Sequence, residues 1–304
     1  MLEIPDGNNN VVAIRSAIEH AQDHIGQPIF INVTTIIGIG TTFAGTSKAH
    51  HKAFGHDNVA ACKKMWNLDP DKTHYVPTTT REYWAEIPKK GKQMVRDWNR
   101  LLDKYDSKYP ELAVEFRRRI QGKFHPDWKQ SLLHLEVETK DMPIRESSAT
   151  VYDHVWNIVP LFAGSADLSE PNFTLKKAKG AFGPPRPDVK NSSYEGRYIH
   201  YGTREHGMIA MANGIAAYSD RAYIPVTATF AMFQAYGASA IRMSALNKVQ
   251  VIHLGTHDSI AEGACGPTHQ PVELINFFRS IPELLHIRPG DAEEAIVSNI
   301  PPNT

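Results

Sequence analysis

The sequence has little cysteine, no net charge and no long apolar run, and each of these features excludes a class of protein. Its two cysteines, Cys62 and Cys265, allow at most one disulfide, too few for a disulfide-stabilised secreted scaffold. Lysine plus arginine and aspartate plus glutamate both number 33, a balance that argues against a nucleic-acid or membrane-binding surface. The longest apolar stretch, around residues 158–164, is far too short to span a bilayer. Because the first residues lack the basic and apolar regions of a secretory signal, we expect a cytoplasmic protein.

Strand and helix patterns alternate after Arg145, and this alternation predicts an α/β fold with a doubly wound parallel sheet. The length of 304 residues permits two domains of about 150 residues each. The expected strands are 161–166, 197–201, 222–226, 249–254 and 284–287, and the expected helices are 148–158, 205–218, 233–245 and 271–278. In such sheets ligands bind at the carboxyl ends of the strands.

The sequence before Arg145 divides into two regions of different character. Residues 1–66 read as an incomplete βα unit, with a helix from Val11, a strand at 28–33, a Gly- and Thr-rich loop and a short helix. Residues 67–145 contain periodic apolar residues among charged ones, which predicts a helical connector. We therefore expect three regions, 1–66, 67–145 and 146–304.

Candidate functional residues follow the predicted strands. Glu205 begins a helix after residues 201–204, while His257 and His269 lie in loops at a strand end and before a helix. Such side chains would converge on one crevice. The plainer alternatives are a carboxylate favoured by the helix dipole and histidines that cap helices or bind loop backbone.

Two further sets of residues are open to more than one interpretation. Phe230, Phe233 and Tyr236 recur every three residues, a spacing that is most often part of a core. His50, His51 and His56 have no carboxylate or cysteine at ligand spacing, so no metal site is expected in this chain.

Several long motifs, in the same order, resemble the transketolase family of thiamine-diphosphate enzymes over nearly the whole chain. They are residues 164–168 (GSADL), 197–207 (RYIHYGTREHG), 244–246 (SAL), 256–260 (THDSI), 266–271 (GPTHQP) and 278–284 (FRSIPEL). The resemblance implies that residues 146–304 form the pyrimidine-binding domain of such an enzyme. It also implies that residues 1–66 are a remnant of the diphosphate-binding domain and that the family's C-terminal domain is missing.

The resemblance implies roles around the cofactor. In the family, the glutamate matching Glu205 hydrogen-bonds N1′ of the aminopyrimidine and acts in a proton relay. Phe233, with Phe230 and Tyr236, matches the aromatic wall that stacks on the pyrimidine, and Asp167 matches an aspartate that helps form the thiamine pocket.

The resemblance also implies roles around the substrate. His50 matches a channel histidine near the thiazolium that transfers protons or binds hydroxyl groups, and His269 matches one near the reacting C1 hydroxyl and carbonyl. Arg145 and His257 match residues that grip the sugar phosphate, as a bidentate cation and a hydrogen-bond donor. The implied reaction is transfer of a two-carbon ketol unit from a ketose phosphate to an aldehyde. The segment around Lys48–His50 is similar to the dihydroxyacetone synthase branch, in which formaldehyde is the acceptor, and a peroxisomal location is then the alternative to the cytoplasm.

The chain departs from the family pattern at several positions. Cys265 replaces an aspartate that reads the acceptor's C2 hydroxyl, Pro171 replaces a serine that contacts phosphate, and His51 replaces a glycine beside the channel histidine. The chain has no Gly-Asp-Gly…Asn motif, so we expect the Mg²⁺ and diphosphate ligands to lie outside it.

Three interpretations remain open. The chain is a piece of a transketolase-type enzyme, or half of a split enzyme completed by a second chain, or an inactive remnant or interaction module. The expected ligands are thiamine diphosphate, Mg²⁺, sugar phosphates and small aldehydes, and the expected protein partner is a second copy or a complementing chain. No nucleic acid or membrane is expected as a partner.

Overall fold

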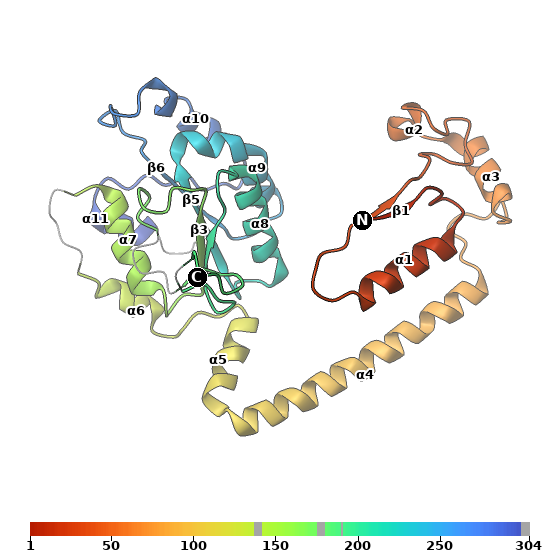
Figure 1. Cartoon of the computed structure of the whole chain (residues 1–304), viewed down its shortest axis with the longest axis horizontal. Helices are drawn as coiled ribbons and strands as arrows, with labels where there is room; N and C mark the ends of the chain where they lie inside the picture. Colours follow the sequence, from red (N-terminus) through yellow and green to blue (C-terminus); the bar gives the residue numbers. More distant parts are fainter. Residues whose placement is uncertain (137–141, 175–179, 190, 299–304) are drawn as a thin grey trace. The chain divides into compact units, whose positions relative to one another are not determined.

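The computed structural model describes residues 1–136, 142–174, 180–189 and 191–298, and the chain divides into two compact units, Met1–Asp97 and Trp98–Thr304 (Figure 1). In the first unit, strands β1 (Leu2–Ile4) and β2 (Ile31–Val33) pair in parallel, and α1 (Val11–Asp23) connects them. The helix expected from Val11 is confirmed, with the side chain of Asn10 accepting a hydrogen bond at its amino end. Strand β1 was not predicted, and β2 is shorter than expected.

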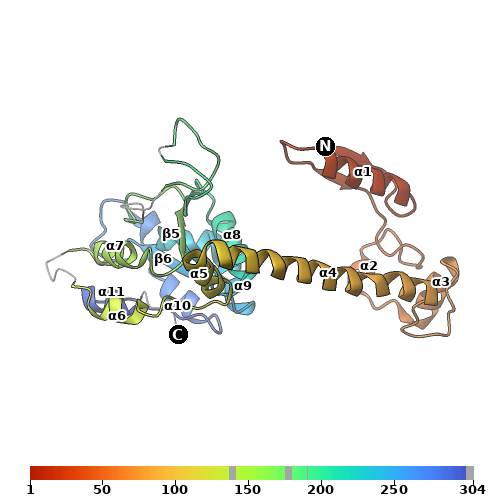
Figure 2. The same cartoon turned by 90° about the horizontal axis from the view of Figure 1, so that it is seen from below.

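Helices make up most of the regular structure of the first unit after β2. They are α2 (Lys48–His51), α3 (Gly55–Met65) and the first part of α4 (Thr78–Lys108). Figure 2 shows α4 as one continuous helix, which lies within the region 67–145 where the sequence predicts a helical connector. It is followed by α5 (Pro110–Ile120), whose first residue is a proline, the position where a missing N–H costs least.

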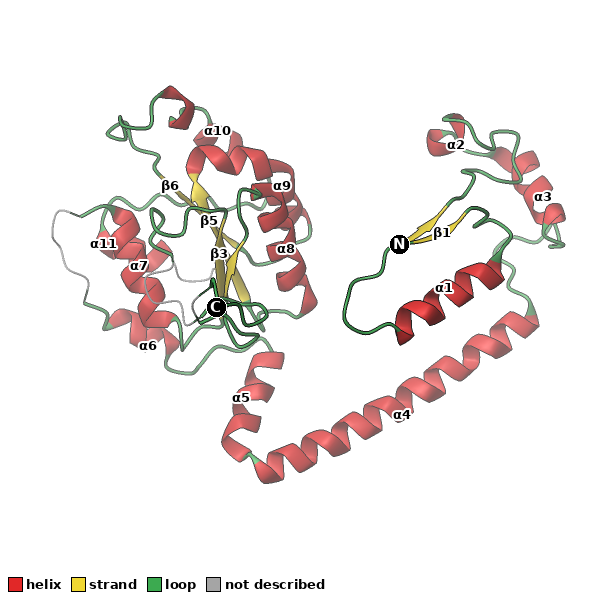
Figure 3. Ribbon diagram, viewed as in Figure 1, coloured by secondary structure: helices red, strands yellow, loops and turns green. Residues whose placement is uncertain are grey.

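The second unit is built on a four-stranded sheet with the order β4-β3-β5-β6, in which every neighbouring pair is parallel (Figure 3). The strands are β3 (Leu161–Ser165), β4 (Tyr198–His200), β5 (Ile224–Phe230) and β6 (Ile252–Thr256). All seven residues of β5 are buried, as expected for an inner strand of a parallel sheet. The predicted α/β fold with a parallel sheet is confirmed.

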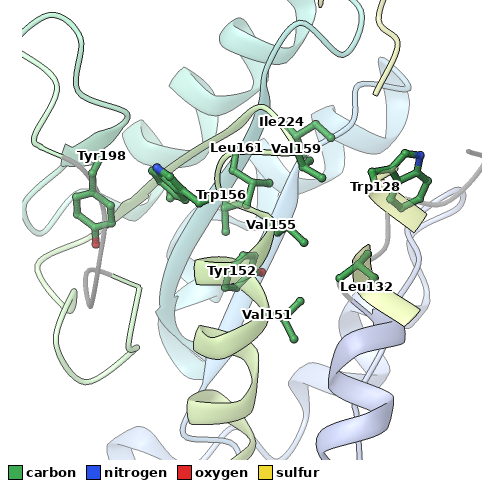
Figure 4. Close-up of a cluster of buried hydrophobic side chains, with 12 residues drawn as sticks. Trp128, Leu132, Val151, Tyr152, Val155, Trp156, Val159, Leu161, Tyr198 and Ile224 are labelled. Carbon is green, nitrogen blue, oxygen red and sulfur yellow. The ribbon is translucent and has the colours of Figure 1, made fainter. Parts of the chain in front are cut away.

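Helices cover both faces of this sheet (Figure 1). The second unit contains α6 (Trp128–Leu133), α7 (Ile144–Val155), α8 (Glu205–Tyr218), η1 (Ala231–Gly237), α9 (Ala238–Leu246), η2 (Pro267–His269), α10 (Leu274–Arg279) and α11 (Ala292–Ser298). One core cluster joins α6 and α7 to the sheet through large side chains such as Trp128 and Trp156 (Figure 4). The second cluster joins α8, α9 and α10 through Met208, Ile241 and Phe278. The sheet is therefore doubly wound.

Two sequence predictions in this unit were wrong in detail. Residues 284–287 form no strand. The side chains of Leu285 and Ile287 are 65% and 57% exposed, so this segment presents no apolar face to the core. The helix expected from Phe233 begins instead as the 3₁₀-helix η1. Across the described residues, no helix combines the length and apolar character needed to cross a bilayer.

Candidate functional site

The carboxyl ends of the four parallel strands share one edge of the sheet, and most of the predicted site residues follow these ends. Asp167 comes two residues after β3, Glu205 follows β4, and His257 comes directly after β6. Arg145, near the start of α7, belongs to the same edge, because its Nη1 lies 3.2 Å from Oε1 of Glu262 in the loop after β6. We call this region the carboxyl edge.

A cluster of aromatic and imidazole rings occupies the carboxyl edge. The ring of Phe230 stacks on His257 with 3.8 Å between centroids, and on Phe233 with 5.7 Å and an interplanar angle of 15°. His269 meets Phe233 edge-on at 5.0 Å, and Tyr236 stacks on Phe233 at 6.1 Å. The structure therefore brings five predicted site residues into one ring cluster.

The three-residue spacing of the aromatic side chains follows from local backbone geometry. Phe230 ends β5, and Phe233 and Tyr236 belong to η1, where residues three apart lie on the same side of the helix. Phe230 is 8% exposed, whereas Tyr236 is 71% exposed. The three aromatic side chains are thus not all part of the core, because Tyr236 faces solvent.

Glu205 is the first residue of α8 and is only 8% exposed. In the described part of the chain its carboxylate has no hydrogen-bond or ion-pair partner, while the helix dipole favours a negative charge at this position. Gly237 lets η1 approach α8 closely, because a Cβ there would lie 2.3 Å from Cδ1 of Ile209 and 3.3 Å from the carbonyl oxygen of Glu205. The close approach places the first turn of α8, where Glu205 lies, against η1, which carries Phe233 and Tyr236.

The backbone is strained at two strand ends. Asp167 and His257 have φ angles of +63° and +58°, in the left-handed region that costs a residue with a side chain about 1–2 kcal/mol. Such conformations cluster where a chain positions functional groups. Asp167 is exposed just after the end of β3.

A chain of hydrogen bonds anchors His257. Its Nδ1 lies 2.7 Å from Oγ1 of Thr256, and this hydroxyl donates to Oδ1 of Asn172 at 2.5 Å. Asn172 in turn donates to Oγ of Ser165 at 3.4 Å. Burial lowers the pKa of the His257 imidazole, an effect that the carboxylate of Glu262 partly opposes.

Some predicted residues lie outside this arrangement, and sequence reasoning missed others. His50 is exposed on α2, in the other unit, so its role remains a prediction. Glu262 and Asn172 were missed, because their partners are 117 and 84 residues away in sequence and no local motif marks them. Cys265 is exposed. Among the described residues, no group of three or more His, Cys, Asp or Glu side chains is placed to hold a metal ion.

Comparison with known proteins places this geometry in context. Residues 1–125 match the family model for the transketolase thiamine diphosphate binding domain, and residues 128–297 match that for the transketolase pyrimidine binding domain. The chain is 39% identical over 298 residues to dihydroxyacetone synthase of Pichia angusta, covering 97% of this chain and 42% of the relative. It is 37% identical to transketolase 2 of Saccharomyces cerevisiae over 296 residues, covering 97% of this chain and 43% of that protein.

Solved structures show the same likeness. A transketolase from Pichia stipitis in complex with sedoheptulose 7-phosphate matches with a TM-score of 0.89 and 34% identity, covering 98% of this chain and 44% of that one. Transketolase from Leishmania mexicana matches with a TM-score of 0.85 and 33% identity, over 97% of this chain and 43% of that one. The chain thus spans less than half the length of the relatives it matches. With both domain models matched in sequence order, the chain belongs to the transketolase family.

Proposed function

We propose that the carboxyl edge is the aminopyrimidine side of a thiamine diphosphate site that serves transfer of a two-carbon ketol unit from a ketose phosphate to an aldehyde. The observation that carries this proposal is that Glu205 is largely buried, its carboxylate has no partner among the described residues, and its helix α8 packs against η1, which carries the stacked ring of Phe233. The likeness to dihydroxyacetone synthases supports formaldehyde as an acceptor.

The residues present fit a flat heteroaromatic group with nitrogen atoms at its edge. Phe233 is half-buried, so it can pack against a ring without first leaving the core. Glu205 would hydrogen-bond a ring nitrogen and hold the proton of that contact, while Phe233, Phe230 and Tyr236 would exclude water from it. Thiamine diphosphate, when bound, supplies the nucleophilic carbon that carries the two-carbon unit. Asp167 and His50 are proposed to complete the thiamine pocket and channel.

On the substrate side, His269 and His257 are placed to contact hydroxyl and carbonyl oxygens. Both rings lie against Phe230, and His269 also meets Phe233, so their orientation is set by packing before a ligand arrives. Arg145 supplies a guanidinium at the same edge. Pre-oriented donors and acceptors of this kind suit a polyhydroxylated substrate.

The direct test is a ketol-transfer assay. Fructose 6-phosphate as donor and formaldehyde as acceptor are incubated with thiamine diphosphate, Mg²⁺ and the chain joined to the diphosphate-binding sequence of a transketolase, because the metal and diphosphate ligands are expected outside these 304 residues, and dihydroxyacetone is measured. The proposal expects product that depends on both added cofactors. Absence of product with formaldehyde and with longer aldehydes alike, from correctly folded protein, would contradict it.

A transketolase-like module without turnover is the second candidate, because Cys265 and Pro171 replace family residues that contact substrate. It predicts that the protein binds the cofactor without forming product. Restoring the family residues, in a Cys265→Asp and Pro171→Ser double variant, distinguishes the two. Activity that appears only in the double variant favours the inactive module.

A further inference from the structure

The guanidinium of Arg145 is already neutralised in this chain. Its Nη1 lies 3.2 Å from Oε1 of Glu262, and the two side chains are 26% and 28% exposed. Gln270 fixes the loop that carries the carboxylate, since its Nε2 donates to the carbonyl oxygen of Glu262 at 2.6 Å. Because the pair is partly buried, solvent screens the attraction less than at the surface.

The hydrogen bonds of His257 fix which of its nitrogens carries the proton. Thr256 has one hydroxyl hydrogen, which it donates to Asn172, so it can only accept from Nδ1 of His257. A neutral imidazole protonated on Nδ1 offers Nε2 as an acceptor. Burial lowers the pKa of His257, which favours the neutral ring. An acceptor nitrogen cannot hydrogen-bond the unprotonated oxygens of a phosphate group.

We propose that Glu262 is a specificity-determining residue, which lowers the preference of this end of the site for a phosphorylated sugar relative to an uncharged, hydroxyl-bearing one. This inference rests on the proposed function, which supplies the sugar-like ligand. A hydroxyl group donates to Nε2 of His257 or to the carboxylate of Glu262, and accepts from Arg145. A phosphate must instead break the Arg145–Glu262 pair and then lie close to a negative charge of the same sign.

The electrostatic cost of placing a phosphate near the carboxylate of Glu262 predicts how removal of that carboxylate changes phosphate affinity. A hydrogen bond to a charged group contributes about 1.5–3 kcal/mol, which corresponds to a factor of about 10–100 in affinity. Glu262→Gln keeps the shape of the side chain and frees the Arg145 guanidinium. We therefore expect inorganic phosphate to bind Glu262→Gln at least about tenfold more tightly than the unmodified chain.

The test is an NMR titration of the 304-residue chain with inorganic phosphate at pH 7, followed through the imidazole resonances of His257 and His269. Glu195→Gln removes one exposed carboxylate elsewhere and serves as the matched control for net charge. Glu262→Ser provides a second variant without the carboxylate. An Arg145→Gln and Glu262→Gln double variant tests whether the gained phosphate lies on the arginine.

The expected result is a gain of tenfold or more in both Glu262 variants, no gain in Glu195→Gln, and loss of the gain in the double variant. In Glu262→Gln the pKa of His257 should also fall, because Glu262 raises it in the unmodified chain. Unchanged phosphate affinity, or a gain that survives without Arg145, overturns the proposal. Since the titration uses neither thiamine diphosphate nor turnover, its outcome is separate from that of the ketol-transfer assay.

Discussion

Two histidines four residues apart, one inside strand β6 and one just beyond its end, have opposite surroundings. His253 has both ring nitrogens occupied, with Nδ1 2.9 Å from Oγ1 of Thr227 and Nε2 3.0 Å from Oγ of Ser244. Burial lowers its pKa to about 4. His257 uses one nitrogen for Thr256, and in the described part of the chain its second nitrogen has no hydrogen-bond partner.

The difference distinguishes residues that stabilise the sheet from residues at its carboxyl edge that are available to a ligand. Inside the sheet, an unpaired polar atom is costly, so every polar group of His253 is matched. At the carboxyl edge, Glu205 and His257 keep polar atoms that have no partner among the described residues, an arrangement that a ligand can complete. Buried residues in the sheet should therefore govern stability, and residues of the carboxyl edge should govern binding and turnover.

The largest expected effect is on turnover at the carboxyl edge. Glu205→Gln keeps the shape of the side chain but removes its acid–base function, so ketol transfer should fall by about 10²–10⁴-fold. The measurement is kcat/KM in the coupled assay, with Glu195→Gln as the control of equal charge change. Activity within twofold of the unmodified protein would remove Glu205 from the proposed proton relay.

The next effect is on folding. His253→Ala leaves the hydroxyls of Thr227 and Ser244 without their ring partner and opens a cavity, which should lower the free energy of unfolding by about 3–5 kcal/mol. His257→Ala, at the edge, should lower it by only about 1 kcal/mol. Urea denaturation of the two variants measures both values. Equal losses would break the distinction between sheet interior and edge.

Acid should lower the free energy of unfolding through protonation of His253, the histidine inside β6. The pKa of His253 is about 4 in the folded chain and about 6.5 when unfolded, so between these values the unfolded chain binds a proton that the folded chain does not. Stability is therefore complete above pH 6.5 and falls by about 3 kcal/mol as the pH drops to 4. His253→Gln should flatten the loss between pH 6.5 and 4, and a profile with undiminished slope would contradict the assignment.

Two glycines provide a further comparison of stability, with effects smaller than that of His253→Ala. A Cβ at Gly164 in β3 would lie 2.5 Å from the carbonyl oxygen of Ile199, so Gly164→Ala should destabilise the fold by about 1–3 kcal/mol. Gly214 lies in α8, where an added Cβ would meet no atom within 4 Å, so Gly214→Ala should stabilise by about 0.5–1 kcal/mol. Thermal unfolding compares them, and shifts of the same sign would contradict the close packing of β3 on β4.

The sequence allowed helices and strands to be predicted where their hydrophobic pattern and their length agree. It was a poorer guide where neighbouring strands determine which residues are buried. Helix α8 has the predicted bounds, because Glu205 begins an uninterrupted helical sequence after the turn at Gly202. Strand β5 extends to Phe230, four residues beyond the prediction, because Thr227 and Thr229 read as polar yet are buried between neighbouring strands. The prediction of a strand at 284–287 failed because pattern alone does not supply a partner strand.

The candidate site was predictable residue by residue but not as a set of contacts. Motifs indicated His257 and His269, the family resemblance indicated Phe230 and Phe233, and the structure shows that their rings meet. The charge state of the edge was not predictable, because Glu262 pairs with an arginine 117 residues away. Side chains brought together by the fold carry no common signal in the sequence.

The most direct test of the central claim, that the carboxyl edge binds the aminopyrimidine group, is a titration of the chain with thiamine, which carries the aminopyrimidine without the diphosphate, followed by NMR. The account predicts that the imidazole resonances of His257 and His269 move together with one dissociation constant, that His253 stays unmoved, and that Phe233→Ala abolishes the shifts. No shift of either edge histidine at the highest soluble concentration of thiamine, or binding unaffected by Phe233→Ala, would contradict it.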